Sequence, residues 1–127
     1  MAGIPSNNAS PRIDVELYGV PGRPNPPIIY SAIVDTGFTG AVSIPTLTAL
    51  PLGLMLYSTA NFTLADGSVQ STFLCAGKAR IGNEERIMAF SLSRGNDILV
   101  GMEFLSLFKV KLELDYKTNS FSLVPQS

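Results

Sequence analysis

Histidine is absent from this chain, and cysteine occurs only once, as Cys75. Without an imidazole, neither a Ser-His-Asp triad nor a Cys-His pair can form, which excludes those nucleophilic hydrolases. A structural zinc site lacks its usual ligands, and an internal disulfide lacks its second thiol. Cys75 lies in an apolar stretch, so we interpret it as a small buried hydrophobe. Carboxylates, lysine, tyrosine and serine are left for catalysis, and we expect no metal and no other cofactor.

Charge is also scarce, because Asp, Glu, Lys and Arg make up 15% of the residues and the net charge is −1. The basic residues are scattered, which argues against a surface that follows nucleic-acid phosphates. The most apolar stretch, 47–57, is interrupted by proline and glycine, and a bilayer needs roughly 20 apolar residues. Residues 1–11 are small and polar and lack the pattern of a signal peptide. We therefore expect a cytoplasmic protein that binds neither nucleic acid nor membranes.

The residues that are present indicate a β-rich domain. Of 127 residues, 46% are hydrophobic, and the chain has 11 glycines and 9 prolines, as expected for many turns. This length is enough for one domain with a real core. We expect a flexible segment over residues 1–11 and a single domain over residues 12–127.

Apolar periodicity predicts most of the strands. Residues 12–18 alternate, with Ile13, Val15 and Leu17 on a buried face and the intervening acids on the other face. The run 28–34 is mostly apolar, which predicts a strand buried on both faces. Residues 109–115 alternate again, with Val110, Leu112 and Leu114 inward. Further strands are predicted at 62–65, 68–71, 73–81, 86–92, 97–101 and 121–124, and short helices at 46–50 and 102–108.

Two glycine-containing turns interrupt these runs at places that matter for function. Asp66-Gly67 lies between two strand-like runs, which predicts a hairpin with a two-residue turn whose central residues both take positive φ. The apolar run 28–34 ends in Asp35-Thr36-Gly37, so a strand delivers a carboxylate into a tight turn. Taken alone, Asp35 also fits an ordinary turn-capping aspartate.

The chain resembles the retropepsin-like aspartic proteases, and in particular their small prokaryotic single-domain members. Three segments carry the resemblance in the family's order: Asp-Thr-Gly-Phe-Thr-Gly, Leu-Ala-Asp-Gly-Ser and Leu-Val-Gly-Met-Glu-Phe-Leu. The resemblance covers roughly residues 12–115. It implies an all-β fold, a closed pepsin-like barrel with one or two short helices.

The resemblance also implies roles for particular residues. Asp35 would be the catalytic residue, with Thr36 and Gly37 positioning it. Gly101 would end the strand that threads the loop carrying the catalytic turn. The flap that covers the substrate would be the tip of the hairpin, with the residues Ala65, Asp66, Gly67 and Ser68.

This sequence departs from the retroviral pattern at three positions. Phe38 replaces the alanine that usually follows Asp-Thr-Gly, and we expect it to reshape the substrate groove. Thr39 and Met102 occupy the places of an acid and an arginine that the retroviral members pair. Because both partners are missing together, no charge is left buried alone.

The single Asp-Thr-Gly has a consequence for assembly. Hydrolysis by carboxylates needs one ionised and one protonated group, and pepsins carry two such turns in one chain. The resemblance therefore implies a homodimer in which each subunit contributes Asp35, acting on a polypeptide bound as an added strand. Two alternatives stay open: a non-catalytic peptide-binding or dimerisation module with the same fold, and a structural β-domain with a coincidental Asp-Thr-Gly.

Overall fold

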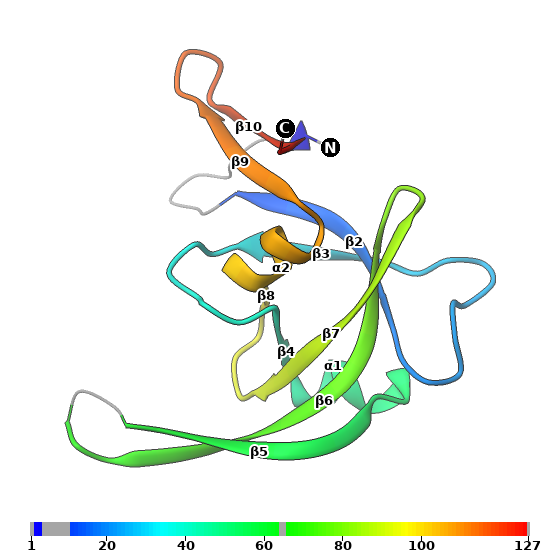
Figure 1. The fold of residues 1–127 in the computed structure, drawn as a ribbon, viewed down its shortest axis with the longest axis vertical. Helices are drawn as coiled ribbons and strands as arrows, with labels where there is room; N and C mark the ends of the chain where they lie inside the picture. The colour runs from blue at the N-terminus through cyan, green and yellow to red at the C-terminus, as the bar shows by residue number, and fades with distance from the viewer. Residues whose placement is uncertain (1, 4–10, 64–65, 127) are drawn as a thin grey trace.

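The computed structural model describes residues 2–3, 11–63 and 66–126, and most of them lie in strands (Figure 1). The elements in chain order are β1 (Ala2–Gly3), β2 (Arg12–Tyr18), β3 (Ile29–Val34), β4 (Val42–Pro45), α1 (Thr46–Ala49), the 3₁₀-helix η1 (Leu50–Leu52), β5 (Met55–Thr63), β6 (Val69–Ile81), β7 (Glu84–Ser93), β8 (Ile98–Val100), α2 (Met102–Leu107), β9 (Val110–Asp115) and β10 (Ser120–Pro125).

A closed barrel forms the centre of the molecule. Strands β2, β3, β8, β4, β7 and β6 pair in that order, and β6 also pairs with β2 to close the barrel. Strand β5 pairs with β6 outside the closed part, and Figure 1 shows their hairpin projecting away from the barrel. The predicted all-β class, a closed barrel with one or two short helices, is confirmed, and the structure has two short α-helices.

The core fills the barrel with the apolar faces that the periodicity predicts. Ile13, Val15 and Leu17 of β2 are each at most 2% exposed. They pack with a cluster that includes Phe90 from β7 and Phe104 from α2, both fully buried. Burying such aromatic and aliphatic side chains is the main force that holds the strands together.

The topology around β3 sets up the functional site. Consecutive strands β3 and β4 do not pair; β8 lies between them, parallel to β3 and antiparallel to β4. The chain that connects β3 to β4, residues 35–41, therefore passes the end of β8. The insertion of β8 between β3 and β4 pairs residues that are 66 positions apart in the sequence, such as Val34 and Val100.

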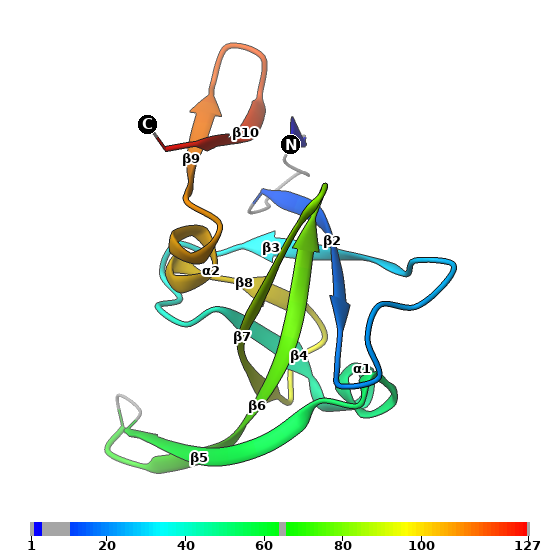
Figure 2. The same cartoon turned by 45° about the vertical axis from the view of Figure 1, so that its right-hand side comes forward.

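A second, smaller sheet contains both ends of the chain. Strand β10 pairs with β9 through residues 120–125 and with the two residues of β1 (Figure 2). Residues 4–10 of the predicted flexible segment lie outside the described residues. The division into a segment 1–11 and a domain 12–127 stays a prediction.

Several predictions of burial and turn geometry were wrong. The first half of the run 28–34 is exposed, with Ile29 at 56%. Strand β8 pairs only with residues 32–34 of β3, so residues 29–31 have a partner on the β2 side alone among the described strands. Leu114 is 46% exposed, because β9 leaves the core toward its far end. The register pairs Thr63 with Val69, so the Asp66-Gly67 hairpin has a longer loop than two residues, and only Gly67 of the pair has positive φ, at 86°.

Element boundaries differ in smaller ways. The predicted strands 68–71 and 73–81 form one continuous β6, and β5 begins at Met55, before the predicted 62–65. The predicted helix 46–50 is α1 followed by η1. Strands 12–18, 86–92 and 121–124 and the helix 102–108 were predicted to within a few residues.

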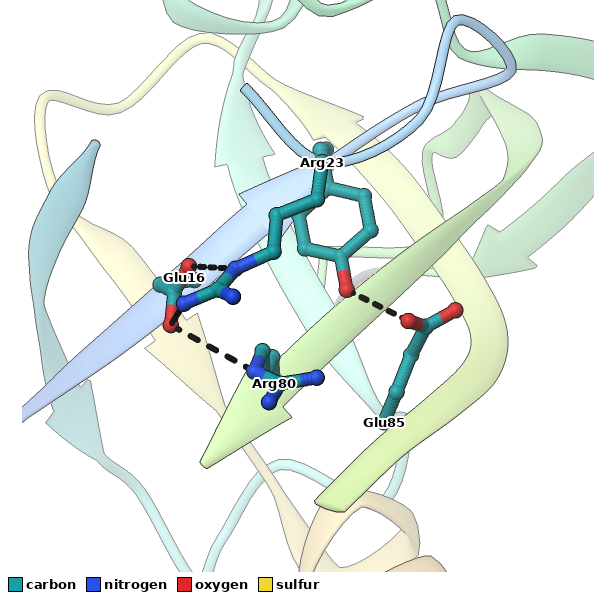
Figure 3. Close-up of polar contacts among 5 residues, drawn as sticks. Glu16, Arg23, Arg80 and Glu85 are labelled. Atoms are coloured by element: carbon teal, nitrogen blue, oxygen red, sulfur yellow. Dashed lines mark hydrogen bonds and ion pairs between the residues drawn. The ribbon is translucent and has the colours of Figure 1, made fainter. Parts of the chain in front are cut away.

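An ion-pair network fastens the proline-rich loop after β2 to the outside of the barrel (Figure 3). Glu16 is 8% exposed, and Arg23 of the loop donates to its two oxygens at 2.7 and 3.1 Å. Arg80 of β6 approaches the same carboxylate at 3.8 Å. Next to this group, the Tyr18 hydroxyl donates to Glu85 at 2.8 Å, and that hydrogen bond is the largest cause of a lowered Glu85 pKa.

Candidate active site

The backbone of Asp35 is fixed by the strand that β3 pairs with. Val34 is opposite Val100 in the parallel β3–β8 pair, and the Asp35 amide donates to the Val100 carbonyl at 2.9 Å. The ladder thus continues one residue beyond β3, and Asp35 is half-buried at its end. The strand end therefore fixes the main chain from which the Asp35 carboxylate projects.

The Asp35 carboxylate caps its own turn. Its Oδ1 accepts the Gly37 amide at 2.9 Å, and the Phe38 amide donates to the Asp35 carbonyl at 3.1 Å. Within the described residues, Oδ2 accepts no hydrogen bond. The Gly37 contact is the one that any turn-capping aspartate makes, so it does not by itself separate a structural from a catalytic role. The free Oδ2 is what a catalytic role requires.

The start of α2 holds the other half of the loop. The amides of Met102 and Glu103 donate to the carbonyls of Phe38 and Gly40 at 2.8 and 3.2 Å. These are amides of the first helical turn, which have no partner inside a helix. In retroviral members, an acid and an arginine join these two segments, and Thr39 and Met102 occupy their places here without charge. The loop 38–40 and the start of α2 are joined instead by main-chain hydrogen bonds.

Glycines permit this close approach. A Cβ on Gly101 would overlap the Phe38 carbonyl oxygen and lie 2.5 Å from that of Gly40. A Cβ on Gly40 would lie 2.7 Å from the ring of Phe38. The Phe38 side chain is half-buried and occupies the space that these two glycines leave.

The hairpin predicted as a flap projects on the same side of the barrel as the Asp35 turn. In Figures 1 and 2, the free end of the β5–β6 hairpin and the loop that follows β3 lie on one side of the barrel. Asp66 accepts the amide and the hydroxyl of Ser68, at 2.9 and 2.6 Å, and these hydrogen bonds lower its pKa. Gly67 is exposed with positive φ, and Ala65 lies outside the described residues.

No family model matches the sequence, and no curated protein matches it. Among solved structures, the chain is similar to a retropepsin-like aspartic protease from Rickettsia conorii, with a TM-score of 0.65 and 16% identity over 98% of this chain and 90% of that one. It is also similar to the simian foamy virus protease, with a TM-score of 0.55 and 13% identity over 75% of this chain and 91% of that one. The fold is retropepsin-like. At these identities the likeness extends to the fold, and the chemistry has to be argued from the residues of this chain.

The retropepsin-like fold brings together some of the predicted site residues and leaves others apart. Asp35, Gly37 and Phe38 form one turn, which lies against Gly101. Thr36 is exposed at that turn. Residues 66–68 lie at the free end of the hairpin, and in the described part of the chain the side-chain hydrogen bonds of Asp66 go to Ser68 and not to the turn.

Sequence reasoning missed two parts of this region. It did not assign the amides of α2 a role in holding the Asp35 loop, because main-chain donors leave no residue-type signal. It also missed a pocket of about 390 Å³ between residues 45–48 and 93–96, which are too far apart in the sequence to form a motif. In residues 2–3, 11–63 and 66–126, no helix has the length and hydrophobicity needed to cross a membrane.

Proposed function

We propose that this protein is an aspartic endopeptidase that acts as a homodimer, with one Asp35 from each subunit in the active site. The observation that carries the proposal is the Asp35 carboxylate itself. It is fixed at the end of β3 by the Val100 carbonyl, it has one oxygen engaged with Gly37, and Oδ2 has no partner among the described residues. The retropepsin-like fold supports this interpretation.

The dimer follows from the chemistry. The sequence has one Asp-Thr-Gly turn, whereas acid–base attack on a peptide bond uses two carboxylates in different protonation states. Two carboxylates about 3 Å apart cannot both ionise, so one stays protonated while the other is ionised. Two copies related by a two-fold axis supply such a pair from a single residue.

Each Asp35 then has a defined part in hydrolysis. The ionised carboxylate takes a proton from water as the water oxygen attacks the peptide carbonyl carbon. The protonated carboxylate donates its proton to the carbonyl oxygen, which gives a tetrahedral intermediate. The first carboxylate then passes the proton it took from water to the nitrogen as the C–N bond breaks, and the second carboxylate takes a proton back from a hydroxyl of the intermediate, so one Asp35 is again ionised and the other protonated. No covalent intermediate forms, and Thr36 and Gly37 keep the two turns in register.

The substrate in this proposal is an extended polypeptide. It pairs as an added strand and is covered by residues 65–68 at the end of the β5–β6 hairpin. Apolar side chains are the expected preference. Phe38 shapes the groove from the side of the catalytic turn.

Replacing Asp35 with Asn tests the proposal. The amide keeps an oxygen for the Gly37 amide but cannot share a proton or deprotonate water, so cleavage of denatured casein or a peptide library should fall at least 1000-fold, on the order of a lost general base. Asp115→Asn is the matched control. The Asp115 carboxylate also accepts the amide two residues on, that of Lys117, at 3.0 Å, in the turn between β9 and β10. This control variant should leave cleavage unchanged.

The outcome also separates the alternatives. Equal cleavage by Asp35→Asn and the wild type would rule out the mechanism. A wild type that binds peptides without cleaving them would instead support the non-catalytic peptide-binding module.

A further inference from the structure

Strand β9 forms an open edge of the small terminal sheet. The sheet has the order β1-β10-β9, so among the described strands β9 pairs with β10 alone. Figure 2 shows the β9–β10 hairpin standing out from the barrel. Strand β9 contains no proline and its register with β10 is unbroken, so it lacks two of the devices that keep an edge strand from pairing with another chain.

One hydrogen bond shows which main-chain groups of β9 face the open edge. The carbonyl of Lys109, directly before β9, accepts the Gln126 amide at 2.8 Å and therefore points toward β10. Across the same trans peptide bond the Val110 amide points the opposite way, and the groups of an antiparallel strand alternate in direction from residue to residue. The amides and carbonyls of Val110, Leu112 and Leu114 consequently face away from β10.

The charges along this edge are self-complementary. Residues 109–115 read Lys-Val-Lys-Leu-Glu-Leu-Asp, with the bases in the first half and the acids in the second. If two copies pair antiparallel about Leu112, each Lys111 lies opposite the partner's Glu113, and apolar residues lie opposite apolar residues. Opposite charges in directly facing positions stabilise a strand pair, whereas like charges destabilise it.

Neighbouring registers lose this match. If the two-fold axis moves to residue 111 or 113, Lys111 faces the partner's Lys111 or Glu113 faces the partner's Glu113. A slip of one residue places charged side chains opposite apolar ones. The register centred on Leu112 also lets the outward groups of all three residues in each strand bond across the edge. Charge and main-chain geometry therefore select the same register.

We propose that the open edge of β9 joins two copies of this chain, with Leu112 on the two-fold axis. The inference rests on the proposed homodimer and names the surface that joins its subunits. A second copy fits this edge because it carries the matching charges in the matching register, and pairing would cover Leu114, which is 46% exposed. Two residues separate β9 from α2, whose first turn holds the loop after Asp35.

Single charge reversals test the contact, with sedimentation velocity over a dilution series as the measurement. Lys111→Glu places acids opposite acids at two points of the symmetric contact, and Glu113→Lys places bases opposite bases, so the homodimer Kd of each should rise about tenfold or more. Both side chains are more than half exposed, so the fold should be kept, which circular dichroism checks. Lys117→Glu, in the exposed turn after β9, is the matched control and should change Kd by less than about twofold.

Mixing the two variants separates a lost contact from a damaged strand. In a heterodimer of Lys111→Glu with Glu113→Lys, each substituted residue faces an opposite charge. Equal amounts of the two should therefore associate with a Kd within about threefold of the wild-type value, as should one chain that carries both substitutions. Native mass spectrometry of differently tagged chains identifies the heterodimer. A loss without this rescue would overturn the β9 contact, as would a monomeric wild type or an equal Kd in all variants.

The failure of this inference is distinguishable from the failure of the proposed function. Peptide cleavage that depends on Asp35 and is unchanged in both single variants, at protein concentrations near the wild-type Kd, would overturn the β9 contact and leave the protease intact. If the wild type cleaves nothing but the loss and rescue of association are observed, the β9 contact stands and the endopeptidase proposal fails.

Discussion

The glycines next to the Asp35 turn matter because they have no side chain. Gly101 and Gly40 have no side chain where the Phe38 carbonyl and ring approach α2. Hydrogen bonds from the start of α2 to the carbonyls of Phe38 and Gly40 depend on that approach. The position of Asp35 therefore depends on glycines that touch no substrate in the proposed mechanism.

Gly101→Ala should damage both stability and cleavage. The new methyl group would meet main-chain oxygens, which cannot rotate away as a side chain does, so the loop 38–40 must move. We expect the free energy of unfolding to fall by about 1–3 kcal/mol, the usual cost of overpacking, with cleavage reduced at least tenfold in the protein that stays folded. Urea denaturation and a peptide assay at matched folded fraction measure the two effects.

Gly95→Ala is the control for this substitution. The nearest heavy atom to its new methyl group would be the Ser93 hydroxyl oxygen at 3.7 Å, an ordinary contact. Its unfolding free energy should change by less than about 0.5 kcal/mol. If Gly101→Ala were equally mild, the close approach of α2 to the Asp35 loop would not matter for catalysis.

Glu16 shows how far residue-level prediction reaches. Alternation correctly placed it on the face of β2 opposite Ile13, Val15 and Leu17, but it did not indicate that this carboxylate is buried. Its burial comes from Arg23 of the following loop and Arg80 of β6 (Figure 3). The second partner reaches it only because the barrel closes between β2 and β6, and local periodicity contains no information on that closure.

At the scale of elements, the sequence of the β5–β6 hairpin fits two roles, a flap over the substrate and a plain surface hairpin. Its strands are long, and much of β5 is exposed, including Leu56 and Tyr57 at 58% and 55%. Both residues lie near the start of β5 and not at its free end, so their exposure fits a substrate-covering flap and a surface hairpin equally. The sequence predicted the hairpin but not the length of its loop. Turn propensity favours a two-residue Asp-Gly turn, and the register, with Thr63 opposite Val69, excludes that turn.

A matched pair of glycines tests the flap. Gly67 at the tip of β5–β6 and Gly82 at the tip of β6–β7 both have positive φ, 86° and 58°, and open space around the missing Cβ. Valine at either position should cost a similar 1–2 kcal/mol, because a β-branched residue fits this region poorly. Gly67→Val should lower cleavage per folded protein about tenfold, and Gly82→Val should leave it within twofold.

The comparison is made with peptide cleavage normalised to folded protein by circular dichroism. Equal activity of the two variants would mean that residues 66–68 form a surface turn only. A loss shared by both variants would indicate a general effect of destabilisation, which the urea midpoints would reveal.

Strand β8 marks the limit of prediction for elements. The sequence predicted an apolar run ending at Gly101, and a strand is there. Its insertion between β3 and β4 was expected only from the resemblance. A run of Ile, Leu and Val fits a buried strand at any position in a sheet, so it does not specify which strands lie on either side. That insertion is what supplies the Val100 carbonyl to Asp35.

At the scale of the whole molecule, the proposal needs a second copy of the chain. The fold presents one Asp-Thr-Gly turn at a half-buried strand end, with Oδ2 unpaired in the described residues. The single motif leads to the same proposal from the sequence alone, because a count of Asp-Thr-Gly turns requires no coordinates. Which surfaces would join the subunits could not be predicted in the same way, since apolar residues are exposed in several places, among them Leu47 at 83% and Tyr116 at 86%.

Subunit mixing tests the shared site directly. Wild-type chains at fixed concentration are unfolded and refolded with increasing amounts of Asp35→Asn. If each site takes one Asp35 from each subunit, mixed dimers are inactive, because the asparagine neither shares the proton nor activates water. Random pairing then makes peptide cleavage fall in proportion to the wild-type fraction, so that an equal mixture has about half the activity of wild type alone. Mass spectrometry of two differently tagged chains checks that mixed dimers form. Activity that stays flat while mixed dimers are present would show that a single chain supplies both acids, with Glu103 or Asp66 as the second, and would rule out a dyad made from two copies of Asp35.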